Sequence, residues 1–575
     1  MNRSSLSNLI GLVLLLGCFT FALFKVFTRN RAEATGGEII RFAHWQLEGG
    51  LRKALDQLAR DYEKLHPGVK VEQLAIPERT YAQWIQTQLI GGTATDILQL
   101  GRLSAGEDEM LARFFQPISD LVEKPNPWNK GTGLENTIWR ETFVDGLTGG
   151  FAYRPNLLEY YGVGMSMFTG RVYYNVSLWK RILGDTPAPA NFSEFLDVCH
   201  RIETYAKEKN VDVIPVAGSK ANGPQLIQKF VTSQTQKMAR ATLRNYSMKS
   251  EAADIGVGYL RGDWTLDTPA ITDAFTINRE VGLLLQPGYM SITREDASFY
   301  FLQSHALMIA TGSWDAPSFR QQADFEIKVF DIPIPSPSHS KYGRNVLGPS
   351  SEAATNVGLT FGINRESKHL DRAIDFLHYI TSRAGNAKFT ELSDWLPAVV
   401  GVTPPPFVVP FLPRTAGYVD GFEIATIGAN TRRIFDNANN TLVQPSGTVD
   451  AYKALLRPDL DGTVRQDLAR LAHISRINIG RQDLILAACA ELVAHSGERI
   501  AATKAAGVTA AKASGTDDAT LAVVGDMARQ LAAETRDDAL LRQRLSQTLE
   551  AQNQQEGQRA WLLGELARPA AAAAR

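Results

Sequence analysis

The feature that most constrains this chain is an alternation of strand and helix patterns between residues 38 and 101. Apolar residues alternate with period two in the strand patterns and recur every three or four positions in the helix patterns. The strand patterns cover residues 39–45, 69–74 and 95–100, and the helix patterns cover 51–65 and 81–89. His66-Pro67-Gly68 ends the first helix, and Gly91-Gly92 ends the second. This order predicts parallel strands joined by crossover helices, which is an α/β sheet.

Polar and aromatic residues follow two of these strands. In open α/β sheets, ligands bind beyond the carboxyl ends of the strands. His44, Trp45, Gln46 and Glu48 come after the first strand, and residues 99–102 come after the third. We therefore expect these residues near a ligand site.

Composition excludes several classes of protein. The chain has 575 residues, which is too long for a single hydrophobic core, so we expect two or three domains. Lys and Arg total 60 against 61 Asp and Glu, and this balance argues against a nucleic-acid surface. The three cysteines are far apart and no Cys/His spacing is typical of zinc, so we expect no disulfide framework, metal site or cofactor.

The first 35 residues carry an uncharged apolar run, Leu9–Phe24. This run is slightly long for a signal-peptide core and slightly short for a membrane span. Three fates stay open: cleavage after Ala34, lipidation at Cys18, or retention as an anchor, which we favour. The positive charges that follow the run oppose export of the carboxyl-terminal side.

Several passages occur in the order found in one known family. The longest is FAHWQLEGGLRKALDQLARDYEKLHPGVKVE, followed by YAQWIQTQLIGGTATDILQLG. Shorter matches lie at Phe114–Leu121, Arg171–Asn175, Phe192–Phe195, Ile309–Trp314 and Trp395–Ala398. Over residues 38–445 the chain resembles the extracellular solute-binding proteins that feed sugar-type ABC importers.

The resemblance implies a two-lobed periplasmic-binding-protein fold of type II-like topology, with a ligand cleft between the lobes. We assign residues 38–165 and 309–350 to lobe I, and residues 166–308 and 351–447 to lobe II. An anchor over 1–35 and a helical extension over 448–575 complete the expected organisation. The extension is rich in alanine and has apolar residues at helical spacing, as in Leu541, Leu545 and Leu549.

A carbohydrate needs aromatic planes for its C–H faces and fixed polar partners for its hydroxyls. Together with the resemblance, this requirement selects ten candidate ligand-binding residues: Trp45, Gln46, Glu48, Gln99, Phe168, Tyr174, Trp264, Trp314, Asp315 and Trp395. The mechanism implied is closure of two lobes over the ligand. We expect no enzymatic activity, permease subunits of an ABC transporter as partners, and a periplasmic or extracytoplasmic location at the inner membrane.

Three alternatives differ in class. The same lobes would serve a membrane-tethered sensor or scaffold that reports the ligand through the carboxyl-terminal helices. A glycoside-active enzyme would need a carboxylate pair, and no motif singles one out. Ferric-ion binding would use the adjacent Tyr173-Tyr174, but strand alternation points the two side chains to opposite faces.

Overall fold

The computed structural model describes Gly17 and residues 37–494, apart from 104–106, 150, 155–156, 158, 243–249 and 354–356. These residues form two compact units. Unit 1 comprises the described residues up to Ile227, then Leu284–Pro335 and Gly348–Tyr418. Unit 2 comprises Gln228–Leu283, Ser336–Leu347 and the described residues from Val419 onward.

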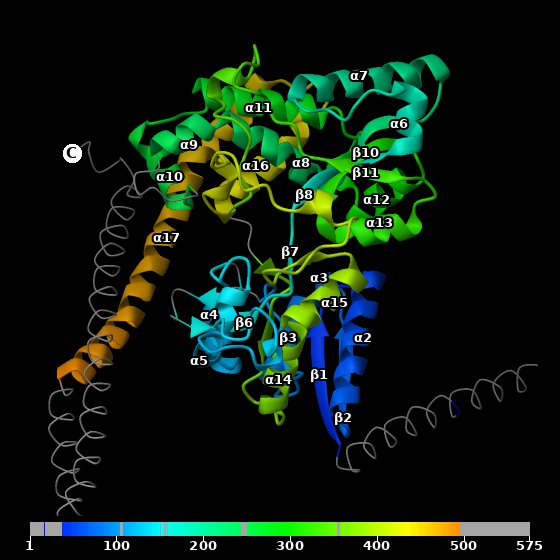
Figure 1. The fold of residues 1–575 in the computed structure, drawn as a ribbon. Coiled ribbons are helices and arrows are strands. Elements are labelled where there is room, and N and C mark those ends of the chain that lie inside the picture. Colours follow the sequence, from blue (N-terminus) through cyan, green and yellow to red (C-terminus); the bar gives the residue numbers. More distant parts are fainter. Residues whose placement is uncertain are drawn as a thin grey trace, which may run out of the picture. The chain divides into compact units, whose positions relative to one another are not determined.

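Unit 1 contains a five-stranded sheet with the strand order β2-β1-β3-β13-β6 (Figure 1). β1 (Glu38–His44) is flanked by β2 (Val69–Ala75) and β3 (Ile97–Gln99), and both pair with it in parallel. β13 (Phe361–Ile363) and β6 (Gly162–Val163) continue the sheet in antiparallel orientation. The predicted α/β fold class is confirmed, and the three parallel strands lie where the sequence patterns placed them.

Two helices cover opposite faces of this sheet, as the period-two alternation of β1 requires. α2 (Gly49–Leu65) packs its apolar stripe in the cluster that contains Ile40 and Phe42. α3 (Glu78–Ile90) packs in the cluster that contains Ala43. The carboxyl ends of β1 and β3 therefore lead into loops whose positions are fixed from both sides.

A second sheet of unit 1 has the order β11-β8-β10-β9. β8 (Gly170–Asn175) pairs antiparallel with β10 (Ala306–Gly312) and with β11 (Ile327–Phe330), while β9 (Ile214–Ala217) runs parallel to β10. The side chain of Asn175 caps α6 (Val176–Leu183) by accepting the backbone N–H of Leu178 at 2.9 Å.

These pairings correct the expected lobe assignment at two strands. Residues 309–312, expected in lobe I, lie in β10 beside β8, and residues 361–363, expected in lobe II, pair with β3. Apolar alternation shows that a strand exists, but its hydrogen-bonding partner depends on tertiary packing that a sequence pattern does not encode.

The other elements of unit 1 are short strands and the helices that cover the two sheets. They are α4 (Glu107–Phe114), α5 (Ser119–Val122), η1 (Pro127–Asn129), η2 (Trp139–Thr142), β4 (Tyr153–Arg154), β5 (Glu159–Tyr160), β7 (Ser166–Met167), α7 (Phe192–Lys209), η3 (Tyr289–Ser291), α12 (Arg294–Leu302), η4 (Ser313–Asp315), α13 (Ala316–Gln322), β12 (Val357–Gly358), α14 (Leu370–Ile380), α15 (Arg383–Ser393), β14 (Leu396–Pro397) and η6 (Val409–Phe411). α8 (Asn222–Gln234) contributes residues to both units.

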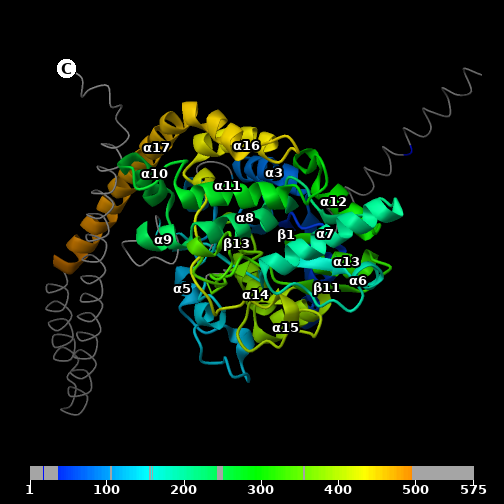
Figure 2. The same ribbon diagram turned by 90° about the horizontal axis from the view of Figure 1, so that it is seen from above.

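The described part of unit 2 is helical. Its elements are α9 (Gln236–Thr242), α10 (Ala252–Arg261), α11 (Pro269–Gly282), η5 (Gly343–Asn345), η7 (Ile424–Thr426), α16 (Ala429–Leu442) and α17 (Val449–Ala494). α16 and α17 run side by side (Figure 2). Asp467 of α17 accepts hydrogen bonds from the backbone N–H groups and side chains of Asn430 and Thr431, and so caps the first turn of α16.

The expected helical extension needs a correction at its start. α17 begins at Val449, close to the expected boundary at 448, but its first half belongs to the core of unit 2. The buried residues recur every four positions and are Tyr452, Leu456, Leu460, Val464 and Leu468. Pro458 lies inside the helix between two residues of this stripe. The helical spacing alone does not say which part of the protein the stripe packs against.

Two expectations concern residues outside the described part of the chain. The apolar run Leu9–Phe24 lies there except for Gly17, and so do the leucine repeats after residue 520. Within the described residues, no helix has both the length and the apolar character needed to cross a bilayer.

Asp467→Ala should destabilise unit 2. The buried carboxylate satisfies two backbone donors of α16, and losing a cap together with charged hydrogen bonds costs about 2 kcal/mol. Urea unfolding followed by circular dichroism measures this loss. Asp461→Ala is the matched control on the same helix, because its exposed pair with Arg465 contributes well under about 1 kcal/mol. Equal unfolding free energies for the two variants would contradict the capping role.

Candidate functional site

The loop after β1 is held by two buried polar side chains. Nδ1 of His44 accepts the backbone N–H of Gln46 at 3.2 Å, so the ring proton lies on Nε2, which donates to Oε1 of Gln73 at 2.8 Å. Burial lowers the pKa of His44 to about 4, and the neutral ring is therefore the native form. Oε1 of Gln99 accepts the backbone N–H of Trp45 at 3.2 Å. Gln99 is buried and positions the loop.

Trp45 is half-buried at the end of this strand, as expected for a binding platform. Its ring packs edge-on against Tyr81 with the centroids 5.1 Å apart. The guanidinium of Arg102, which follows β3, lies 5.7 Å from the Trp45 ring centroid and is paired with Glu78. Gln46 is half-buried beside Trp45. The loops after β1 and β3 therefore meet, as the parallel order predicts.

A second aromatic group forms around Trp314, in η4 directly after β10. Trp314 is half-buried, and its ring lies edge-on to Phe168 at 5.7 Å. Phe168 in turn contacts Trp395 at 5.1 Å. Trp395 is 1% exposed, and its Nε1 has no hydrogen-bond partner among the described residues. Three of the predicted residues are thus brought together from distant parts of the chain.

Arg294 contacts residues that follow both sheets. Its guanidinium pairs with Asp315, lies 5.9 Å from the Trp314 ring centroid and approaches Oε1 of Glu48 to 3.9 Å. Thr311 fixes the other oxygen of Asp315 through a hydrogen bond of 2.6 Å. Glu48 follows the first sheet and Asp315 follows the second, so the segments after β1 and β10 meet at one cation.

Burial acts on both charges of this contact. It raises the pKa of Glu48, and the nearby Arg294 only partly opposes that shift. Burial also works against the Arg294 cation, but Asp315 and Glu48 more than offset it, so the pKa of Arg294 is raised. The pair is held in a partly desolvated setting in which charge interactions are stronger than in water.

Sequence reasoning missed Arg294, although the chain contains a signal for it. Arg294 is the first residue of α12, which Thr293 caps, and a cation there opposes the helix dipole. A side chain that breaks a local rule often has a role elsewhere in the fold. In this structure that role is the contact with Asp315 and Glu48.

Two predicted site residues lie elsewhere. Trp264 is 1% exposed in the core of unit 2, where its Nε1 donates to the carbonyl of Ile255 at 3.0 Å. It fills the space left open by Gly258, where an added Cβ would come within 3.3 Å of the indole. Tyr174 packs against Trp179 at 4.8 Å and Phe330 at 5.9 Å. Both positions look loop-like or strand-terminal in the sequence. In the structure, however, both rings pack against other side chains of the protein.

A cavity of ≈ 620 Å³ lies at the opposite edge of the first sheet. It is lined by the start of β1, by residues 92–96 before β3 and by residues 364–369 before α14. Asp96 in its wall is fully engaged: it accepts the backbone N–H of Arg41 at 2.8 Å and the hydroxyl of Ser367 at 2.6 Å. This cavity is at the amino-terminal edge of the parallel strands, away from the loops that carry Trp45 and Glu48.

Comparison with known proteins identifies the family. The sequence profile described as "Bacterial extracellular solute-binding protein" matches residues 48–387, more than half of the chain. The chain belongs to this family. The predicted recognition is therefore confirmed, and the match includes Glu48, Arg294 and Trp314.

Named relatives of this solute-binding protein are distant. The multiple sugar-binding protein of Streptococcus mutans is 21% identical over 401 residues, which cover 68% of this chain and 83% of the relative. A protein named as the periplasmic-binding protein YcjN of an Escherichia coli ABC transporter is 21% identical over 483 residues, covering 83% and 94%. The solved structure of a chitin oligosaccharide binding protein matches with a TM-score of 0.50 and 16% identity, covering 74% of this chain and 99% of that one. That likeness shows the shared fold.

The neutral state of His44 predicts a pH-dependent stability. The ordinary pKa of 6.5 applies in the unfolded chain and about 4 in the folded one, so the unfolded state binds the proton first. The contribution of His44 to the free energy of unfolding is fully present above pH 6.5. It should fall by on the order of 2 kcal/mol as the pH drops toward 4. His44→Gln should flatten this slope in urea titrations, leaving the contribution of buried His378, whose pKa is also lowered to about 4. The control is His200→Gln, at an exposed position of α7. An unchanged slope in His44→Gln would show that this ring does not govern the effect.

Proposed function

We propose that this solute-binding protein captures a carbohydrate with the residues around Trp45, Glu48, Trp314 and Arg294 and delivers it to an ABC importer. The observation that carries the proposal is the approach of Arg294 to Glu48, which follows β1, while the same guanidinium lies 5.9 Å from the Trp314 ring centroid after β10. A second half-buried indole, Trp45, lies beside Arg102. Sugar binding in the Streptococcus mutans relative, by its name, supports the same ligand class.

The chemistry of these residues suits a sugar. Indole rings present flat apolar faces for the C–H faces of a pyranose, and a stacking contact is worth about 1 kcal/mol beyond the area it buries. Arginine and carboxylate groups make directional hydrogen bonds to hydroxyls and are already fixed by Asp315 and by burial. A ligand that reaches Trp45 and Trp314 together binds the closed arrangement better than an open one, and this difference drives closure.

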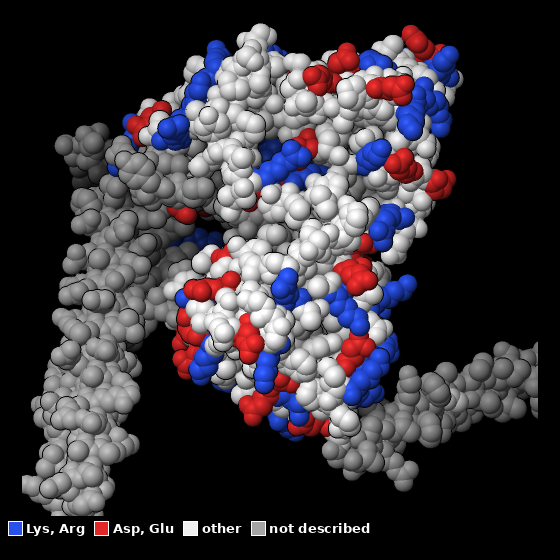
Figure 3. Space-filling model, in the orientation of Figure 1, with Lys and Arg blue, Asp and Glu red and all other residues white. Residues whose placement is uncertain are grey.

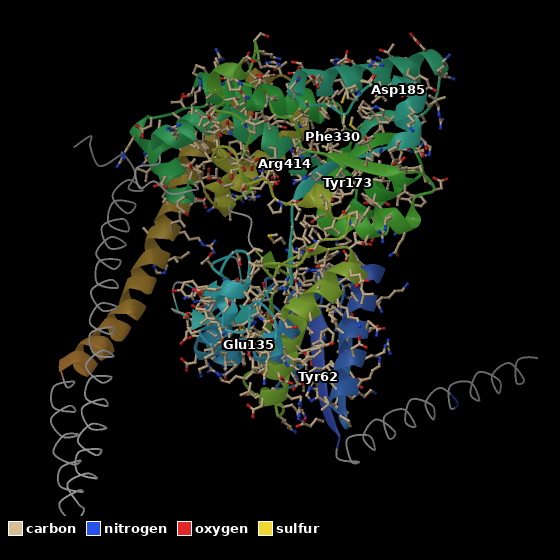
Figure 4. All side chains as sticks on the ribbon, viewed as in Figure 1. Tyr62, Glu135, Tyr173, Asp185, Phe330 and Arg414 are labelled. Atoms are coloured by element: carbon tan, nitrogen blue, oxygen red, sulfur yellow. The ribbon has the colours of Figure 1, made fainter. Side chains whose placement is uncertain are left out.

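Two rival functions find no support in the same residues. Tyr173 and Tyr174 are neighbours on β8, so strand alternation points their side chains to opposite faces. The Tyr173 hydroxyl donates to the carbonyl of Gly312, and the Tyr174 ring packs against Phe330 (Tyr173 and Phe330 are labelled in Figure 4). This arrangement disfavours a shared ferric ion. Acidic and basic side chains are interspersed over the face shown in Figure 3, which disfavours a nucleic-acid partner on that face. The family consists of solute-binding proteins, and we propose no enzymatic activity for this member.

The proposal places the protein outside the cytoplasmic membrane, in contact with permease subunits of the importer. Its support is membership of an extracellular family and the apolar run Leu9–Phe24, which would act as an anchor or export signal.

Raffinose, chitotriose and maltotriose, screened by thermal shift and calorimetry, test the carbohydrate proposal. A ligand at 100 times its Kd stabilises the folded state by about 2.7 kcal/mol, which raises the melting temperature by several degrees. For the sugar that binds, Trp314→Ala should weaken affinity by about ten-fold, because a stacking face is lost. Trp264→Phe is the matched control: it should lower stability and leave affinity unchanged. Absence of binding for all three sugars would reject the proposal.

A further inference from the structure

The charges around Trp314 and Trp45 are unequally matched. Arg102 is paired with Glu78, and Arg294 is paired with Asp315. Glu48 has only the long approach of 3.9 Å to Arg294, a cation already engaged by Asp315. Among the described residues, Glu78 and Asp315 each have a close guanidinium partner, and Glu48 does not.

Two buried polar atoms at this site have no hydrogen-bond partner among the described residues. Oε2 of Glu48 accepts no hydrogen bond from any described residue, and Nε1 of Trp395 donates none. The Glu48 side chain is 16% exposed and Trp395 is 1% exposed, so bulk water satisfies neither atom well. Buried groups in native proteins almost always find partners, and those that do not call for an explanation.

A bound ligand supplies that explanation. Glu48 also leaves its helix uncapped, because its side chain makes no hydrogen bond to the first turn of α2. The carboxyl group interacts with the backbone N–H groups of Glu48 and Leu47, while its Oε2 has no hydrogen-bond partner among the described residues. An acceptor that is buried, negatively charged and unused by its own helix is suited to a donor that arrives with the ligand.

We propose that Glu48 is a charge filter in the carbohydrate site. Its free oxygen accepts a hydrogen bond from a hydroxyl or ammonium group of the ligand, so the protein takes neutral and amino-substituted sugars and rejects uronic acids and other anionic sugars. This inference rests on the proposed carbohydrate-binding function and assigns the ligand class within it.

The rejection follows from elementary electrostatics. A ligand carboxylate placed near Glu48 meets an uncompensated like charge in a partly desolvated site. Arg294, the cation that pairs with Glu48 in the described part of the chain, would have to give up Asp315, which Thr311 holds from its other side. We expect an affinity penalty of about 100-fold for the anionic sugar at low ionic strength.

The test uses the full chain and a series of sugars that differ only in charge. The best binder among raffinose, chitotriose and maltotriose is compared by calorimetry with its 6-carboxylate and 6-amino derivatives, on wild type, Glu48→Gln and Glu48→Ala. Glu123→Gln is the control, since Glu123 is an exposed carboxylate paired with Arg140. Melting temperatures of the ligand-free variants establish that each is folded.

The filter predicts a carboxylate derivative about 100-fold weaker than the neutral sugar on wild type, and a penalty at least about ten-fold smaller on Glu48→Gln. The amino derivative should bind wild type at least as well as the neutral sugar and lose affinity in both Glu48 variants. Equal binding of neutral and carboxylate sugars to wild type, or a penalty that Glu48→Gln leaves intact, overturns the filter while the carbohydrate function stands. If none of the three neutral sugars binds wild type, the carbohydrate function fails and the filter fails with it.

Discussion

The parallel pairing of β1 with β3 is the constraint on which the rest of the site depends. Phe42 lies opposite Ile97 and Ala43 opposite Leu98, so the two strands end at the same edge of the sheet. That register lets Gln99 hold the backbone of Trp45 and brings Arg102 over its ring. A slip of one residue would reverse every side chain on β3 and remove both contacts.

Buried polar groups that serve the backbone support this edge. His44 and Gln99 touch the loop after β1 from two directions, and both are shielded from water. In a low-dielectric setting such hydrogen bonds are stronger, and an unmatched one is costly. The loop is therefore presented to a ligand already ordered, which reduces the entropy lost on binding.

Charged contacts connect the first sheet to the second within unit 1. Glu48 approaches Arg294, and Asp394, at the end of α15, pairs with Arg320 of α13. Burial raises the pKa of both carboxyl groups. One apolar cluster also contains residues of both sheets, such as Phe42 of β1 and Ile309 of β10, so burial rather than these ion pairs supplies most of the contact energy between them.

Local patterns in the sequence predicted the strands and helices of residues 38–101, the α/β class and the family. They also selected Trp45, Glu48, Trp314 and Asp315 as ligand-binding candidates, and the structure brings Glu48 and Asp315 to one guanidinium. Ligand binding by these residues stays a prediction. Sequence could not supply the partner of β10 or the burial of Trp264, because both are decided by contacts between segments far apart in the chain. Arg294 was not predicted for the same reason. Its partner Asp315 lies 21 residues after it, and its partner Glu48 lies in the loop after β1.

The most direct measurement is hydrogen–deuterium exchange of the full chain with and without the sugar that stabilises it. If one ligand is held by both sheets, amides of 45–48 and of 312–315 should slow together and to a similar extent. Slowing at only one of these segments, or instead around the cavity at 92–96 and 364–369, would contradict a shared site at Glu48 and Arg294.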